Sequence, residues 1–331
     1  MKGTIPANLL NRSITRHLTK KSGSVCQGPG RDGAVFSCEN TMVSAAGFAA
    51  DEFSDMSAGE TALIIAENNM TASRALPEYM NIYITAEEGC SEEKLRQEMI
   101  RLPSLAKEKG FRIIGGNTAY FGQGDGYSVT VNLLGRLAEK DSKAEDMSGG
   151  ADMKISPQVG DLVVIWGPAG HFGVSRLIHK KWDVLRERFS ERFLRECMMD
   201  PEDSLAHSIP GAYLMHDVSY GGVYRALYDL SEWSGFGIEL THENIPIRQD
   251  TIEIAEFFNI NPYCLMGVGI MTGLCRPESA EILKNSPEYG AGLIGIAGVL
   301  TEKKEKVVRS EKFAMQRFLT PYTQDEIFKR L

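Results

Sequence analysis

The sequence predicts a two-domain protein of the α/β (α+β) class, and three observations lead to this prediction. A chain of 331 residues exceeds what one hydrophobic core usually holds. Strand-like and helix-like segments alternate in both halves, as α/β architecture requires. Residues 138–157 are charged and then Ser/Gly-rich, without an apolar period. We therefore place a domain boundary there and expect one domain over residues 1–150 and another over residues 151–331.

Apolar spacing and punctuation predict the elements of the first half in order. Ser91 is a candidate N-cap for the second long helix, and Pro103 should kink or interrupt that helix. In residues 127–134 apolar side chains alternate, which is typical of a half-buried strand. The expected elements are a short helix over Ile5–Leu18, an apolar run at Ala34–Phe36, a helix over Thr61–Ala75, a strand over Asn81–Ala86, a helix from Ser91, a strand over Phe111–Ile114 ended by a Gly-Gly-Asn-Thr turn, and a strand over Tyr127–Leu134.

The second half is predicted in the same way. Val223, Leu227 and Leu230 share one helical face, and Gly235 is a natural terminator for that helix. The other expected elements are a strand over Asp161–Trp166, a glycine loop opening a helix at Gly167–Gly173, a charged helix over Trp182–Met199, an apolar strand over Ala212–Met215, strands over Phe236–Leu240 and Leu293–Leu300, and a capping box at Thr323–Glu326 that opens the last helix.

Composition narrows the functional classes. The net charge of −8 argues against a nucleic-acid partner, because binding to phosphate backbones needs clustered Lys and Arg. No apolar run approaches the roughly 20 residues that span a bilayer, so no membrane partner is expected. The N-terminus shows no secretory pattern, and the six cysteines are scattered without a CxxC pair. We therefore expect a cytoplasmic protein with reduced, mostly buried thiols.

Two glycine-rich segments of the second half are candidate ligand turns. The first, HDVSYGG, runs from His216 to Gly222, between an apolar strand and an amphipathic helix. Asp217 or Ser219 could cap that helix, while Gly221 and Gly222 allow a close backbone approach. A helix N-terminus of this kind can bind an anion, although a plain capped loop explains the same residues.

The second segment, GPAGHFG, matches neither the dinucleotide fingerprint nor the Walker A pattern, and a tight strand-to-helix turn also accounts for it. Its His171 could donate to a phosphate or simply pack. In the first half, GRDGAV and GGNT place polar side chains at expected turns. Mg²⁺ prefers hard oxygen ligands, and Asp32, with Glu39 nearby, supplies the obvious carboxylates; solvated turn acids remain the alternative.

Taken in order, these segments resemble the aminoimidazole-ribonucleotide-synthetase-related superfamily. HDVSYGG is similar to the HDVSDGG of formylglycinamidine-ribonucleotide synthetases. The stretch GIELTHENIPIRQDTIEIAEFFNINPYCLMGVGIMTG resembles the hydrogenase-maturation nitrile synthase branch, and the resemblance runs from about Ile5 to Ser310. It implies a first domain whose sheet pairs with that of a second subunit in a homodimer, a larger second domain, and Mg·ATP bound between the two domains.

The resemblance also implies a set of site residues, carried over position by position. Asp32 and Asp217 are the candidate catalytic residues, and Asp32 and Glu39 the candidate metal ligands. The candidate cofactor-binding residues are Arg31, Asn68, Asn69, Gly115, Gly116, Asn117, His171, Ser219, Gly221 and Gly222.

This chain departs from the family where the family holds Mg²⁺. Arg31-Asp32 replaces two consecutive acids, Asn69 stands in an Asn-Asp-Leu motif, and Asn117 stands in a Gly-Asp-Thr motif. An amide oxygen can coordinate a cation but brings no charge, so weaker Mg²⁺ binding is expected, and Arg31 could contact a phosphate directly. The branch also ends in a reactive cysteine, whereas this chain ends in Lys329-Arg330-Leu331.

Two functions follow as expectations. The first is an ATP-binding protein that phosphorylates, and thereby activates, a small-molecule substrate. The second is a catalytically degenerate homodimer of the same fold that serves as a binding or regulatory protein.

Overall fold

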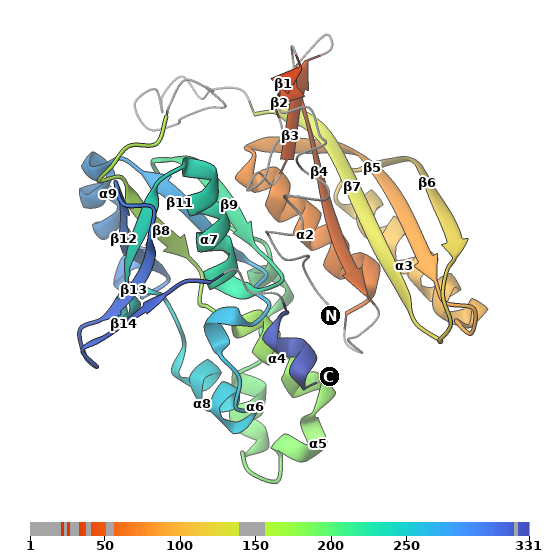
Figure 1. The fold of residues 1–331 in the computed structure, drawn as a ribbon. Helices are drawn as coiled ribbons and strands as arrows, with labels where there is room; N and C mark the ends of the chain where they lie inside the picture. The colour runs from red at the N-terminus through yellow and green to blue at the C-terminus, as the bar shows by residue number, and fades with distance from the viewer. Residues whose placement is uncertain are drawn as a thin grey trace.

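The computed structural model describes residues 21–22, 25–26, 33–37, 41–50, 56–138, 156–320 and 324–330. Within them the chain forms two seven-stranded mixed sheets, one from each half of the sequence (Figure 1). The first sheet ends at Leu137 and the second begins at Leu162, so the predicted domain boundary falls in a stretch that lies mostly outside the described residues. The α/β (α+β) prediction is confirmed.

The first sheet has the order β1-β2-β3-β4-β7-β5-β6, and β6, its edge strand, runs parallel to β5. Helices α2 and α3 pack on one of its faces, where the alternating apolar side chains of β4, β5 and β7 form the core. The elements are β1 (Lys21–Ser22), β2 (Val25–Cys26), β3 (Gly33–Ser37), β4 (Thr41–Ala50), α2 (Ala58–Ala72), β5 (Ala75–Ala86), α3 (Glu92–Glu108), β6 (Arg112–Tyr120) and β7 (Tyr127–Leu137).

The second sheet has the order β14-β13-β10-β12-β8-β11-β9, antiparallel except between β10 and β13. Its strands are β8 (Leu162–Trp166), β9 (Ala212–Val218), β10 (Gly237–Thr241), β11 (Ile270–Cys275), β12 (Ile294–Thr301), β13 (Lys306–Ser310) and β14 (Met315–Phe318). Its helices are α4 (His171–Lys180), α5 (Trp182–Leu185), α6 (Glu191–Glu196), η2 (Pro201–Ser204), α7 (Gly222–Ser234), η3 (His242–Asn244), α8 (Gln249–Phe257), η4 (Pro262–Cys264), η5 (Pro277–Ser279), α9 (Ala280–Lys284), α10 (Pro287–Gly290) and η6 (Glu326–Lys329).

The two halves share a hydrophobic cluster. Ile64 and Ile65 of α2 are buried together with Phe172 and Leu177 of α4 and with Ile327 of η6. In Figure 1, α2 accordingly lies between the first sheet and the elements of the second half. Burial of apolar surface on both sides of α2 holds the halves together.

Several predicted features are confirmed. Ser91 caps α3 by accepting a hydrogen bond from the amide of Lys94 at 3.3 Å, and residues 127–135 of β7 alternate between buried and half-buried positions. Val223, Leu227 and Leu230 are fully buried on one face of α7, and Gly235 ends this helix with a φ of 76°. The helix predicted over Ile5–Leu18 lies outside the described residues.

Three local predictions are wrong. Pro103 lies inside α3 and does not interrupt it, because the neighbouring helical turn is exposed and water can satisfy the carbonyl that loses its partner; the alternative of a kink there stays a prediction. The charged stretch from Trp182 divides into α5 and α6, since Ser190 starts a new helix by capping the amide of Phe193. The last helix is a 3₁₀ turn, and its N-cap is Asp325.

The thiol prediction is confirmed for the cysteines whose environment the structure describes. Cys90, Cys197, Cys264 and Cys275 are all free and buried.

In the part of the chain described above, no helix combines the length and the apolar character that a membrane crossing requires.

Candidate functional site

Three glycine-containing segments of the second half meet at one place. They are the turn between β8 and α4 (residues 167–173), the turn between β9 and α7 (residues 219–222), and residues 265–269 before β11. The amide of Gly173 donates to the carbonyl of Met266 at 3.0 Å, and the amide of Gly267 donates to the carbonyl of Ser219 at 3.1 Å. Residues 265–269 therefore join the two turns that sequence analysis singled out.

Glycine is required where these segments touch. Gly222 has a φ of 67°, and a Cβ atom there would lie 2.6 Å from the carbonyl oxygens of both Tyr263 and Leu265. Gly170 has a φ of 71°, and its Cβ would lie 2.5 Å from the carbonyl oxygen of Pro262. Left-handed backbone and close packing both exclude a side chain, so these turns depend on glycine.

Both turns present helix N-termini. Gly170 is the N-cap of α4 and Gly221 the N-cap of α7, so neither N-cap residue supplies a capping side chain. The positive end of each helix dipole favours an anion there. The predicted capping of α7 by Asp217 or Ser219 is wrong, because the left-handed Gly221 starts the helix and Ser219 contributes its carbonyl oxygen instead.

Asp217 lies at the end of β9, inside the sheet. It pairs with Met271 of β11 and is 3% exposed. The Nδ1 atom of His216 lies 3.7 Å from one of its carboxylate oxygens. Asp217 is therefore in the strand that precedes the glycine turn, and not in the turn itself. Its catalytic role remains a prediction.

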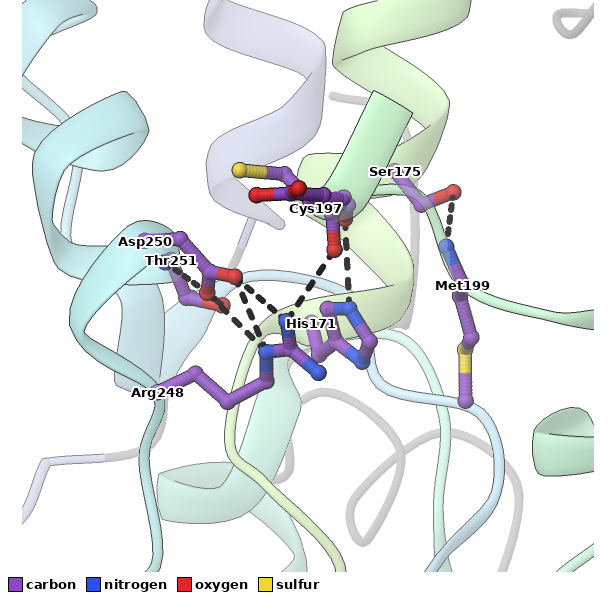
Figure 2. Close-up of polar contacts among 8 residues, drawn as sticks. His171, Ser175, Cys197, Met199, Arg248, Asp250 and Thr251 are labelled. Atoms are coloured by element: carbon purple, nitrogen blue, oxygen red, sulfur yellow. Dashed lines mark hydrogen bonds and ion pairs between the residues drawn. The ribbon is translucent and has the colours of Figure 1, made fainter. Parts of the chain in front are cut away.

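His171 is held in a buried polar cluster at the start of α4 (Figure 2). Its Nε2 atom lies 3.2 Å from the carbonyl oxygen of Cys197, which can only accept, so Nε2 carries the hydrogen. Burial lowers the pKa of His171, which keeps the ring neutral. The thiol of Cys197 is also protonated, because burial and the nearby Asp250 raise its pKa to about 12.

Arg248 and Asp250 fix the other side of this cluster, as Figure 2 shows. Arg248 contacts both oxygens of Asp250 and donates to the carbonyl of Glu196 at 3.1 Å. Burial works to raise the pKa of Asp250, but the guanidinium outweighs it and the pKa lies below its usual value. Sequence reasoning did not single out this pair, whose only local signal is a basic and an acidic residue two positions apart.

Asn68 and Asn69 lie at the junction of the two halves. The Asn68 amide donates to the carbonyl of Ser204 at 3.1 Å and accepts from the amide of Ala206 at 2.8 Å, so it joins α2 to the second half. The side-chain amide of Asn69 instead contacts the first sheet, where it donates to the carbonyl of Ala46 at 2.8 Å. Within the described residues, the Oδ1 atom of Asn69 is buried and has no hydrogen-bond partner.

Gly115, Gly116 and Asn117 are not brought to this place. They lie within β6, so the predicted Gly-Gly-Asn-Thr turn is wrong, and all of β6 is exposed. The pairs Ala46–Asn132, Asn132–Asn81 and Asn81–Gly115 form one row across β4, β7, β5 and β6. Three strand spacings, about 14 Å, therefore separate Gly115 from the strand that Asn69 contacts.

Strand β6 contains Gly116 for a steric reason. A Cβ atom at Gly116 would collide with the carbonyl oxygen of Ile82, so glycine is needed where β6 approaches β5.

Of the remaining predicted site residues, Arg31, Asp32 and Glu39 lie outside the described residues. Among the residues that are described, no group of three His, Cys, Asp or Glu side chains is arranged to hold a metal ion.

Comparison with known proteins bears on the whole chain. Residues 158–311 match the family described as AIR synthase related protein, C-terminal domain. The carbamoyl dehydratase HypE of Cupriavidus necator is 25% identical over 224 residues, which are 65% of this chain and 59% of that protein. HypE of Rhodobacter capsulatus is 23% identical over 274 residues, 81% of this chain and 77% of that protein. The chain thus spans about three fifths of the length of the first of these relatives.

Solved structures share the fold. The HypE–HypF complex matches with a TM-score of 0.63 and 20% identity, covering 87% of this chain and 93% of that one. HypE in complex with ATP matches with a TM-score of 0.62 and 16% identity, covering 98% and 94%. Thiamine monophosphate kinase of Aquifex aeolicus matches with a TM-score of 0.58 and 14% identity, covering 92% and 95%.

The family matched by residues 158–311 and the folds of these relatives agree with the resemblance in the glycine turns. Residues 158–311 are similar to the AIR synthase related C-terminal domain, and the chain has the fold of HypE and thiamine monophosphate kinase.

Proposed function

We propose that this protein binds Mg·ATP at the glycine turns of the second half and uses it to phosphorylate, and so activate, a small-molecule substrate. The observation that carries the proposal is the meeting of two helix N-termini whose N-caps are glycines, those of α4 and α7, around residues 265–269. Backbone amides at such helix starts bind phosphate groups without a basic side chain, which suits a chain of net charge −8.

The relatives support this assignment by what they bind. One matched structure is HypE in complex with ATP, and another, AaThiL, is complexed with AMPPCP and TMP. The curated relatives are named carbamoyl dehydratase. Phosphoryl transfer is mainly positioning and electrostatic stabilisation, so a site made largely of backbone amides and a metal ion is sufficient for it.

The residues for the metal ion are partly suitable. The Oδ1 atom of Asn69 is a buried hard oxygen that has no partner among the residues that the structure describes, which fits a cation ligand or a metal-bound water. Asn69 brings no charge, so the proposal assigns the charged ligands to Asp32 and Glu39 and a phosphate contact to Arg31. Mg²⁺ would neutralise phosphate charge at such a site.

Titration calorimetry with saturating Mg²⁺ tests the proposal directly. We expect ATP to bind to the wild-type protein, and Asp32→Ala to weaken this binding in a Mg²⁺-dependent manner. Glu302→Ala, an exposed acid in the second half, serves as the matched control and should bind ATP like the wild type. Absence of heat with the wild type at saturating Mg²⁺ would reject nucleotide binding.

A second candidate function is a degenerate binding or regulatory protein. The amide of Asn68 favours it, because both of its ends are engaged by Ser204 and Ala206 and a nucleotide would have to replace them. ATP hydrolysis or substrate phosphorylation that disappears in Asp32→Ala would exclude this alternative. Nucleotide binding without turnover would support it.

We also propose that the protein is a homodimer. The face of the first sheet opposite α2 exposes Phe48 and Tyr83, and the edge strand β6 exposes Ile114 and Tyr120. Apolar side chains gathered on one face mark an interaction surface. Light scattering at micromolar concentration should give twice the chain mass, and Ile114→Lys should shift it to the monomer. Ile282→Lys, at another exposed position, on α9, should leave the mass unchanged.

A further inference from the structure

The C-terminal segment of residues 324–330 contacts the glycine turns through one carboxylate. Asp325 accepts from the amide of Gly221 at 2.5 Å, from the amide of Met266 at 3.1 Å and from the amide of Ile327 at 2.9 Å. The first two amides belong to the α7 turn and to residues 265–269. The side chain of Asp325 therefore accepts hydrogen bonds from the α7 turn and from residues 265–269, where the proposed function places the phosphate groups.

This carboxylate is deeply buried. Asp325 is 1% exposed, and Ile327 beside it is fully buried in the cluster shared by the two halves. Phe328 stacks on Tyr220, the residue before Gly221, with ring centroids 5.8 Å apart. The segment thus covers the N-terminus of α7 as well as bonding to it.

A buried acid is an unusual choice for a purely structural contact. Burial raises the pKa of Asp325 to about 7, against the three amide donors that favour the ionised form. The neighbouring Glu326 adds a smaller repulsion, while Lys329 is paired with Glu326 at 2.6 Å. Because the carboxylate is costly to bury, an anion that fits the same amides better can compete with it.

The segment is also built to separate locally. It is a single 3₁₀ turn, Glu326–Lys329, whereas the strands of the second sheet are held by pairing with one another. Short 3₁₀ turns have poorer hydrogen-bond geometry than α-helices, so a turn of this kind opens locally at lower cost than a paired strand.

We propose that residues 324–330 are a displaceable strap, in which Asp325 holds the amides of Gly221 and Met266 until an anionic ligand group takes its place. The ligand class is a phosphate-bearing molecule, and this part rests on the proposed function. The strap is an autoinhibitory contact, since the ligand-binding amides are available only in the fraction of molecules in which it has moved.

The test compares Asp325→Ala and Asp325→Asn with Glu326→Gln, a change of the adjacent acid that does not contact these amides. Calorimetry with Mg·ATP, and separately with pyrophosphate, should show roughly fivefold or tighter binding to Asp325→Ala, because the fraction of competent molecules rises. Asp325→Asn, which keeps an acceptor for Met266, should be intermediate, and Glu326→Gln should bind like the wild type. Equal or weaker binding to a folded Asp325→Ala would overturn the strap.

Hydrogen exchange without ligand separates this inference from the proposed function. Amides of residues 326–330 should exchange by local opening, about 100-fold faster than those of the buried strand β11. Exchange of the segment only at the rate of β11 would overturn the strap even if ATP binds. If no variant binds ATP or pyrophosphate, the proposed function and the competition both fail, and fast exchange would then leave only a loosely held terminus.

Discussion

The glycine-rich segments of the two halves look alike in sequence and differ in structure. In the second half, Gly170 and Gly221 adopt left-handed backbone after a strand and start the helices α4 and α7. In the first half, Gly115 and Gly116 stay within the edge strand β6. The difference shows that glycines near a strand end form a left-handed turn where a helix follows, and stay in the strand where a neighbouring strand pairs with them.

Packing partners decide between the two outcomes. Gly222 lies against the carbonyls of residues 263 and 265, which hold the turn in place, whereas Gly116 lies against the carbonyl of Ile82 in the neighbouring strand. Neither partner is near in sequence. Substitutions at glycines that share a left-handed backbone, but differ in how closely neighbouring atoms approach, therefore test the comparison most sharply.

The largest expected effect is that of Gly222→Ala. The new Cβ atom would press on two backbone carbonyl oxygens that cannot move independently, so we expect a loss of more than about 3 kcal/mol in the free energy of unfolding. Gly235→Ala is the matched control, since it has a similar φ of 76° but open space around it. It should cost only about 1 kcal/mol. Urea unfolding measures both, and equal losses would contradict the role assigned to close packing at the turn.

The next effect is a pH dependence at the turn. The pKa of Asp325 is about 7 in the folded protein and near 3.8 when unfolded, so between pH 4 and 7 unfolding releases a proton. The contribution of this residue to stability is therefore greatest below pH 4, falls as pH rises to 7 and is constant above it. Relative to Asp325→Asn, the wild type should lose on the order of 3 kcal/mol across this range. A difference in free energy of unfolding that does not change from pH 4 to 8 would show that the carboxylate is already ionised throughout.

A smaller effect separates the two asparagines of α2. Asn68→Ala leaves the buried carbonyl of Ser204 and the amide of Ala206 without a partner, so we expect a loss of about 2 kcal/mol. Asn69→Ala removes one hydrogen bond, to Ala46, and should cost about 1 kcal/mol. Thermal unfolding of both variants checks the order, and a larger loss at Asn69 would mean that its amide bears more of the structure than its single bond indicates.

The smallest effect concerns the cluster around His171. Arg248→Lys loses the two-pronged contact with Asp250, and because Arg248 is 44% exposed we expect a loss of no more than about 1 kcal/mol. Arg192→Lys, whose pair with Glu196 is exposed, should leave stability unchanged. A shift of the His171 ring signals in the NMR spectrum of Arg248→Lys, and not of Arg192→Lys, would show that Arg248 positions His171.

Much of the fold could be predicted from local patterns. The alternation in β7, the Ser91 cap and the apolar face of α7 depend on neighbours within one element, and all are confirmed. Two of the errors, the turn predicted at Gly115–Thr118 and the cap predicted for α7, arose where distant contacts decide. The glycines of β6 are in a strand because β5 pairs with them. Helix α7 starts at a glycine and not at a capping side chain because residues 263–267 pack closely against the turn.

The candidate site was predictable in its glycine turns but not in its surroundings. HDVSYGG and GPAGHFG do meet, although no sequence pattern shows that residues 265–267 join them. The contacts of Asp325 with Gly221 and Met266 span 104 and 59 residues, beyond the reach of any local pattern. The resemblance names both Asn69 and Asn117 as cofactor-binding residues, but within one chain Asn69 lies on α2 and Asn117 in the edge strand β6.

Hydrogen exchange with and without saturating Mg·ATP tests the central claim most directly, because it reads both glycine regions in one experiment. We predict that ATP slows exchange in peptides that cover residues 167–173 and 216–222, and leaves the edge strand of residues 112–120 unchanged. Slower exchange confined to residues 112–120, or unchanged exchange in both glycine turns while ATP is bound, would contradict the assignment of the nucleotide site to the second half.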